Sequence, residues 1–169
     1  QYVSSAAAQT VSAAPQLMVH RLGEAEHPAV DGHVDEAIWM NTEPFSGFIQ
    51  QWPDEGQPAS ERTAIRVPID RAHPYGGIIC FDSEPEQIVV SQSRRDADLD
   101  DTDSIQILLD TFNDGQNAFV FGTNPFGIEF DAQVRGESQS GQSNRGGFNL
   151  NWDADWTVRA QTSERGWEA

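Results

Sequence analysis

The sequence predicts an all-β protein, and within that class a two-sheet antiparallel β-sandwich of the jelly-roll or immunoglobulin-like kind with about ten short strands. Short apolar runs rich in Ile, Val and Phe recur between turns built from Asn, Asp, Gly and Pro, which is typical of strand meanders. No stretch of helical length keeps a helical period across these turns. The 169 residues are enough for one domain with a real hydrophobic core.

The first part of the domain is expected to hold three strands and one helical turn, at residues 17–22, 35–39, 45–52 and 63–69. The helical turn should carry Ile38 and Trp39 into the core. Pro68 lies in the last of these strands, and because proline donates no backbone hydrogen bond, it places that strand at an edge or a bulge. Residues 1–16 hold few large apolar side chains, so we expect a disordered or extended arm before a domain that spans residues 17–169.

The centre and the end of the chain continue the same pattern. Further strands are expected at residues 75–81, 87–93, 105–112, 118–123, 128–133, 148–152 and 156–161, and one more begins at Trp167. Turn signals separate the three central strands, since residues 113–115 read Asn-Asp-Gly and residues 124–127 read Asn-Pro-Phe-Gly. Residues 136–147 are rich in Gly and Ser, which is typical of a flexible loop.

The charge of the chain excludes several classes of partner. Its formal net charge is -17, from 27 acidic residues against 10 arginines and no lysine. Nucleic-acid binding requires a basic surface, and an anionic membrane attracts basic segments, so neither partner fits. An excess of carboxylates instead suits divalent cations, solubility at high salt, or both.

The remaining composition favours an exported protein. The lone cysteine, Cys80, lies in an apolar run and is expected to be a small buried side chain. No run approaches the roughly 20 apolar residues of a membrane helix. The chain begins with Gln rather than Met and continues with an Ala- and Ser-rich stretch, as mature exported proteins often do after signal-peptide removal.

An acidic run enters the central strands, with carboxylates at Asp96, Asp98, Asp100, Asp101 and Asp103. Calcium is bound mostly by carboxylates and carbonyls of flexible loops, so these residues are the candidate calcium ligands. The run does not have the spacing of an EF-hand loop. Its carboxylates repel one another unless a cation neutralises them. The adjacent arginines at 94 and 95 offer an alternative to a metal, as does a solvated loop.

Two tryptophans are candidate platforms for a sugar. Carbohydrate recognition stacks a sugar ring on an exposed aromatic side chain and adds hydrogen bonds from polar groups. Trp52 lies at a strand–loop junction, and Trp152 adjoins the Gly- and Ser-rich loop. The candidate polar contacts beside them are Gln51, Asn124 and Asn151. The other tryptophans follow core patterns and are expected to be buried: Trp39, Trp156 and Trp167.

No catalytic residue is predicted. A glycosidase needs two carboxylates at a suitable separation, but among 27 acidic residues some pair will always satisfy that distance. The sequence has no Ser-His-Asp order, no HExxH motif and no phosphate-binding glycine loop. We therefore expect a non-catalytic protein. An accessory domain of a glycoside hydrolase would be one such protein.

Several runs occur in a suggestive order: DGHVDEAIW at 31–39, DSIQILLD at 103–110, FVFGTNPFGIEFD at 119–131, WDADW at 152–156 and GW at 166–167. Together they resemble family 9-like carbohydrate-binding modules, whose opening reads DG-x-x-DE-x-x-W. The runs ERT at 61–63, RRD at 94–96 and LDTFND at 109–114 resemble one branch of that family in particular. That branch lies N-terminal to an uncharacterised bacterial outer-membrane-type β-barrel region.

The resemblance implies a β-sandwich that often carries calcium and that binds a polysaccharide or an oligosaccharide. It implies an exported protein of the periplasm, the outer membrane or the extracellular space, with a C-terminal β-barrel region of the same protein as a further partner. The alternative is a protein-interaction or plug domain for that barrel, without sugar affinity. Family members continue past Gly166-Trp167 into one more strand, which we expect this sequence to lack.

Overall fold

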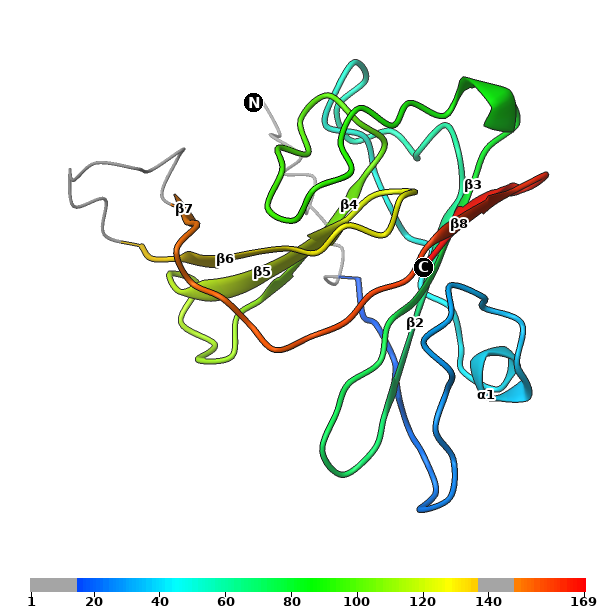
Figure 1. The fold of residues 1–169 in the computed structure, drawn as a ribbon, viewed down its shortest axis with the longest axis vertical. Coiled ribbons are helices and arrows are strands. Elements are labelled where there is room, and N and C mark those ends of the chain that lie inside the picture. The colour runs from blue at the N-terminus through cyan, green and yellow to red at the C-terminus, as the bar shows by residue number, and fades with distance from the viewer. Residues whose placement is uncertain (1–14, 137–147) are drawn as a thin grey trace, which may run out of the picture.

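The fold is a β-sandwich of two sheets, as the sequence predicts, in a computed structural model that describes residues 15–136 and 148–169. The five-stranded sheet has the order β1-β2-β3-β9-β8, with strands at Val19–Arg21, Thr63–Ile69, Gly77–Phe81, Gly166–Glu168 and Gln161–Ser163. The four-stranded sheet has the order β4-β5-β6-β7, with strands at Ile105–Leu109, Ala118–Thr123, Phe130–Val134 and Phe148–Asn149. Figure 1 shows the sheets as two groups of strands that run in different directions.

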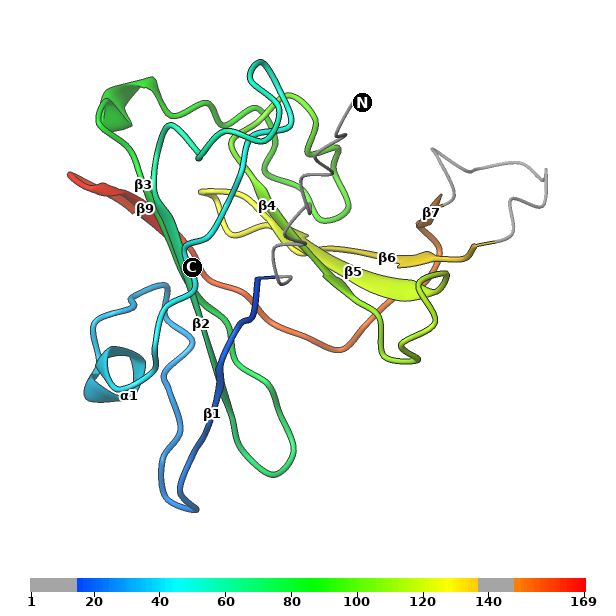
Figure 2. The same ribbon diagram turned by 180° about the vertical axis from the view of Figure 1, so that it is seen from behind.

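The five-stranded sheet packs against the helical turn α1 (Ala37–Met40), which lies beside β2 in Figure 2. Trp39 is 4% exposed and, with Val34 and Ile79, forms a buried cluster. Its indole ring lies on Gly77, where a ring carbon is 2.6 Å from the position that a Cβ would occupy. A side chain at that position would collide with the indole, so the glycine permits the contact. The predicted burial of Trp39 is confirmed, and Ile38 packs against the same cluster.

The four-stranded sheet is organised by its turns and by one tight contact. Val120 and Ala132 are cross-strand partners, and neither has any exposed surface (0% for both). Leu99, from the loop before β4, covers Gly122. One of its methyl carbons is 2.7 Å from the position that a Cβ on Gly122 would occupy. Between β4 and β5, Asn113 and Gly115 have φ values of 53° and 65°, which is the left-handed conformation that the predicted turn requires.

Three predicted strands are not formed as strands. Residues 45–52 make only isolated bridges, because residues 51–56 turn and bend and leave no partner of strand length. Residues 87–93 follow a 3₁₀ turn (η1, Pro85–Gln87), and there the Val89 N–H binds the Asp103 carboxylate at 2.5 Å instead of a neighbouring strand. In the third case, residues 156–160 are irregular and β8 begins only at Gln161.

The strand that contains Pro68 is not at an edge, so the edge position expected for it is wrong. β2 lies inside the five-stranded sheet, but it pairs with β3 only through Thr63–Arg66. Pro68 lies beyond this ladder, where its carbonyl accepts the Tyr75 N–H at 2.9 Å. The N–H that proline lacks would therefore fall outside the β2–β3 ladder. Most of the predicted arm (1–14) and of the predicted flexible loop (137–147) lies outside the described residues.

Candidate functional site

One face of the four-stranded sheet carries aromatic side chains. Phe119 and Phe121 are two residues apart on β5, so both point to the same face. In the β5–β6 ladder, Phe119 is opposite Gln133 and Phe121 is opposite Asp131. This face therefore combines two phenyl rings with polar side chains from the neighbouring strand.

Two tryptophans from the segment after β7 contact these rings. Trp152 stacks on Phe119, with ring centroids 4.6 Å apart and planes at 29°. Trp152 and Trp156 each meet Phe121 edge-on, at centroid distances of 6.0 and 5.3 Å, a geometry that aromatic pairs prefer. All four residues are only partly buried. We call Phe119, Phe121, Trp152 and Trp156 the aromatic cluster.

Asp131 holds the segment that carries the tryptophans. Its side chain is 1% exposed. One carboxylate oxygen accepts the Ala154 N–H at 2.7 Å, and the other accepts the Trp156 indole N–H at 3.4 Å. Residues 151–160 form no strand, so these bonds take the place of a backbone ladder in fixing the segment on the sheet.

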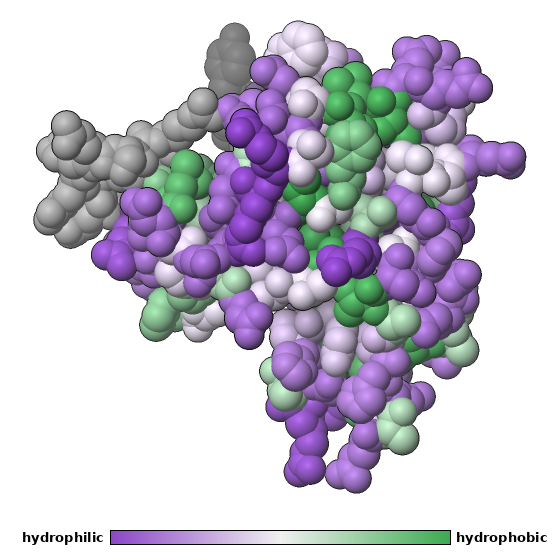
Figure 3. Space-filling view, viewed as in Figure 1, coloured by the Kyte–Doolittle hydropathy of each residue, from purple (hydrophilic) through white to green (hydrophobic). Residues whose placement is uncertain are grey.

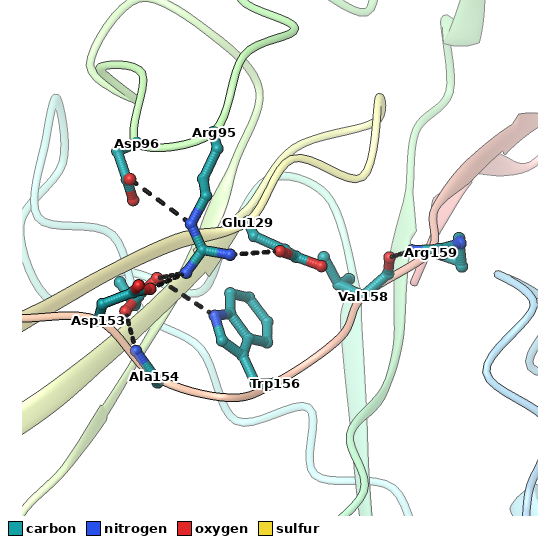
Figure 4. A network of polar contacts seen from close by, with 9 residues as sticks. Arg95, Asp96, Glu129, Asp153, Ala154, Trp156, Val158 and Arg159 are labelled. Atoms are coloured by element: carbon teal, nitrogen blue, oxygen red, sulfur yellow. Dashed lines mark hydrogen bonds and ion pairs between the residues drawn. The ribbon is translucent and has the colours of Figure 1, made fainter.

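A guanidinium group joins this segment to two others. Figure 4 shows Arg95 reaching from the loop before β4 toward carboxylates of β6, its preceding turn and the segment after β7. Its Nη1 lies 2.6 Å from Glu129 Oε2, and its Nη2 lies 2.8 Å from Asp131 Oδ1 and also contacts Asp153. Its Nε is 3.6 Å from Asp96 Oδ2. We call these five residues the Arg95 network.

The Arg95 network is negatively charged as a whole. Desolvation acts to lower the pKa of the Arg95 guanidinium, but the surrounding carboxylates, Asp131 foremost, raise that pKa above its usual value. Arginine is thus firmly charged here, yet it faces four carboxylates. A neutral or cationic ligand suits this surface better than an anionic one.

The two predicted sugar platforms lie in different parts of the molecule. Trp52 is 84% exposed and, with the exposed Gln51, belongs to a loop closed by the Gln50–Gln57 backbone bond of 2.8 Å. Figure 1 places that loop at the top of the molecule, away from β7 and the segment that follows it. The structure therefore separates Trp52 from Trp152 and places only Trp152 in the aromatic cluster.

The predicted polar contacts differ in the same way. Asn151 is exposed next to Trp152, and its backbone N–H binds Asn149 Oδ1 at 3.2 Å. Asn124 is fully buried at 0% exposure. Its amide donates to the Gln92 carbonyl at 2.8 Å and accepts the Phe126 N–H at 3.0 Å. Asn124 is thus a structural residue of the turn after β5, and the expectation that it contacts a sugar is wrong.

The acidic run does not gather its carboxylates around one point. Asp96 faces Arg95, Asp98 Oδ1 accepts the Asp100 N–H at 3.0 Å, and Asp103 Oδ2 accepts the Val89 N–H at 2.5 Å. Asp100 and Asp101 are exposed. In the parts of the chain that the structure describes, no group of three or more His, Cys, Asp or Glu side chains is arranged to hold a metal ion. The predicted calcium ligands do not fit a shared site, although Asp96 pairs with arginine as the alternative expects.

Most of the residues that form this site are not among those that the sequence predicts. Phe119 and Phe121 were assigned to a strand, and their two-residue spacing does indicate a common face. Trp156 was expected in the core, but it is only partly buried. The Arg95 network joins residues 36 and 58 positions apart, and no local pattern indicates such contacts.

Comparisons of this chain with protein-family models, with curated proteins and with solved structures gave no match. In residues 15–136 and 148–169, no helix has the length and apolar character needed to cross a membrane.

Proposed function

We propose that this domain is a non-catalytic carbohydrate-binding module whose ligand lies on the aromatic cluster. The observation that carries the proposal is the grouping of partly exposed aromatic rings on one sheet face, next to charged and amide side chains. Aromatic rings stack on the apolar face of a sugar, and neighbouring polar groups bind its hydroxyls.

Amide side chains extend the same row across the sheet. Phe119 pairs with Gln133, which in turn pairs with Asn149 on β7. Both amides are partly buried and lie on the face that Trp152 covers. A sugar ring stacked beside Trp152 would meet amide donors and acceptors on this row. The negatively charged Arg95 network lies next to Phe121, because Asp131 is the cross-strand partner of that residue. Its charge favours binding of a neutral or amino sugar over an acidic one.

Affinity electrophoresis against a panel of plant, algal and bacterial polysaccharides tests the proposal. We expect at least one neutral polysaccharide to retard the wild-type chain. Trp152→Ala should abolish that retardation, whereas the control Trp52→Ala, at an 84% exposed position on another part of the surface, should keep it. Trp152→Ala also removes the stacking on Phe119, at a cost of about 1–2 kcal/mol, so each variant is used only below its own melting temperature. Unchanged migration in every gel contradicts the proposal.

The resemblance to family 9-like modules supports three further parts of the proposal. They are export to the periplasm, outer membrane or cell exterior, a C-terminal β-barrel region in the same protein, and calcium as a stabilising ion. The acidic run offers no shared site for that ion, so sugar binding as proposed uses none. Secretion of a reporter fused to the full-length precursor tests the first part.

A second candidate, a protein-interaction or plug domain, is favoured by exposed apolar side chains in the loops. Figure 3 shows hydrophobic surface over the loops at the top of the view, where residues 45–60 and 82–103 run in Figure 1. Ile49 and Val89 in these loops are 67% and 55% exposed. This candidate predicts retention on a column carrying the β-barrel region, lost in Ile49→Lys. Passage of the wild-type chain without retention contradicts it.

A further inference from the structure

The face of the five-stranded sheet that carries α1 also carries a half-buried arginine, Arg66. Arg66 lies on β2 directly opposite Gly77 of β3, so its side chain emerges on the face where Trp39 packs on Gly77. Figure 2 shows α1 beside β2 on this side of the molecule. The guanidinium and the indole are therefore neighbours on one sheet face, far from the four-stranded sheet that carries the aromatic cluster.

These two side chains hold polar atoms that the protein leaves unpaired. The Nε and Nη1 atoms of Arg66 and the Nε1 atom of Trp39 are buried, and none of them has a hydrogen-bond partner among the described residues. All three are donors. Folded proteins pair nearly all buried polar atoms, and an unpaired group calls for a specific explanation. Donors alone, with a positive charge among them, require an acceptor that is preferably negative.

Two other arginines lie near Arg66 in a strongly acidic chain. Burial and then the charges of Arg62 and Arg165 lower the pKa of the Arg66 guanidinium. Arg62 lies over the Phe81 ring at 5.0 Å, and Arg165 pairs with Glu168 at 2.5 Å. Arg62 and Arg165 thus lie close enough to act on Arg66, although the chain carries a net charge of -17. Because Arg165 is paired with Glu168, the charges of Arg66 and Arg62 are the ones that can attract an anion.

We propose that Arg66 and Trp39 form a binding site for an oxyanion, a carboxylate or a phosphate group, with Arg62 supplying further positive charge. The oxyanion accepts hydrogen bonds from the guanidinium and the indole and neutralises the charge of Arg66. The site is independent of sugar binding, because Arg66 belongs to the five-stranded sheet and Trp39 to the helical turn that packs on it, whereas the aromatic cluster lies on the four-stranded sheet.

Thermal unfolding at constant ionic strength tests the site, with sodium chloride replaced stepwise by sodium acetate or sodium phosphate. Because a ligand of the native state stabilises it by mass action, the melting temperature should rise by about 3–5 °C at an anion concentration ten times the dissociation constant. Arg66→Met should lose this response. The control Arg71→Met, at an 85% exposed side chain, should keep it. A response to acetate but not phosphate identifies a carboxylate site, and the reverse identifies a phosphate site.

Arg66→Met should also melt no lower than wild type in chloride alone, because it removes two buried donor atoms that have no partner among the described residues. If that variant fails to fold, the Trp39 indole N–H resonance of the wild-type chain gives the answer. Titration with acetate or phosphate should shift it to saturation, while the indole resonances of the other tryptophans stay in place. Equal melting responses of wild type and Arg66→Met, or an indole resonance that none of the anions moves to saturation, overturn the proposal.

Discussion

Asp131 is the residue on which the position of the aromatic cluster depends. Its buried carboxylate accepts hydrogen bonds from Arg95, Ala154 and Trp156. Asp131→Asn keeps the size of the side chain but removes its charge and one acceptor oxygen. The Arg95 side chain then loses its buried partner, although it is 39% exposed and solvent compensates part of that loss. We expect the free energy of unfolding to fall by about 2–3 kcal/mol.

Urea denaturation followed by tryptophan fluorescence measures this loss, and a melting curve should show a drop of about 5–10 °C for a chain of this size. The matched control is Asp153→Asn. Asp153 contacts the same guanidinium, but its side chain is 80% exposed, so the control should change stability by less than about 0.5 kcal/mol. The reasoning is refuted if Asp131→Asn is as stable as wild type, or if both variants lose the same amount.

Three other outcomes follow from the structure. If calcium stabilises the fold, excess chelator should lower the melting temperature by several degrees. An unchanged melting temperature would contradict a stabilising role for calcium. Gly122→Val should lower the free energy of unfolding in urea by about 1–3 kcal/mol, because the valine side chain would collide with Leu99, which lies 2.7 Å from the position of a Cβ on residue 122. An unchanged free energy of unfolding would show that the loop before β4 is loosely packed. Hydrogen bonds from the Ala72 and His73 backbone lower the pKa of Asp70. Its ionised form therefore stabilises the fold above the unfolded pKa of about 3.9, and this stabilisation is lost as the pH falls toward the lower folded value. The melting temperature of Asp70→Asn should thus fall less steeply than that of wild type below about pH 4, and parallel curves would contradict this.

The strands with clear local signals could be predicted from the sequence. The expected strands at residues 63–69 and 118–123 coincide with β2 and β5, because alternating apolar residues and turn residues at each end specify them together. Residues 45–52 and 87–93 have apolar residues of the same kind. They fail to form strands because a strand also needs a partner of matching length, and that partner is set by the whole fold.

The candidate site could be predicted only in part for the same reason. Trp152 was identified by its place beside a loop, but its contact with Phe119 depends on the path of residues 151–160, which side chains fix. The polarity of Asn124 indicates a surface position, whereas the turn buries it: its amide nitrogen donates to the Gln92 carbonyl and its amide oxygen accepts the Phe126 N–H. Arg95 was considered as a partner of the acidic run, yet most of its partners come from distant segments.

The central claim is that a sugar lies on the aromatic cluster, and the indole N–H resonances of the five tryptophans test it most directly. An oligosaccharide from the polysaccharide that retards the chain would be titrated into labelled protein. The account predicts saturating shifts of the Trp152 and Trp156 resonances, with Trp52 unmoved. Shifts confined to Trp52 would place the ligand on the exposed loop instead, and no shift of any indole resonance would contradict sugar binding by these rings altogether.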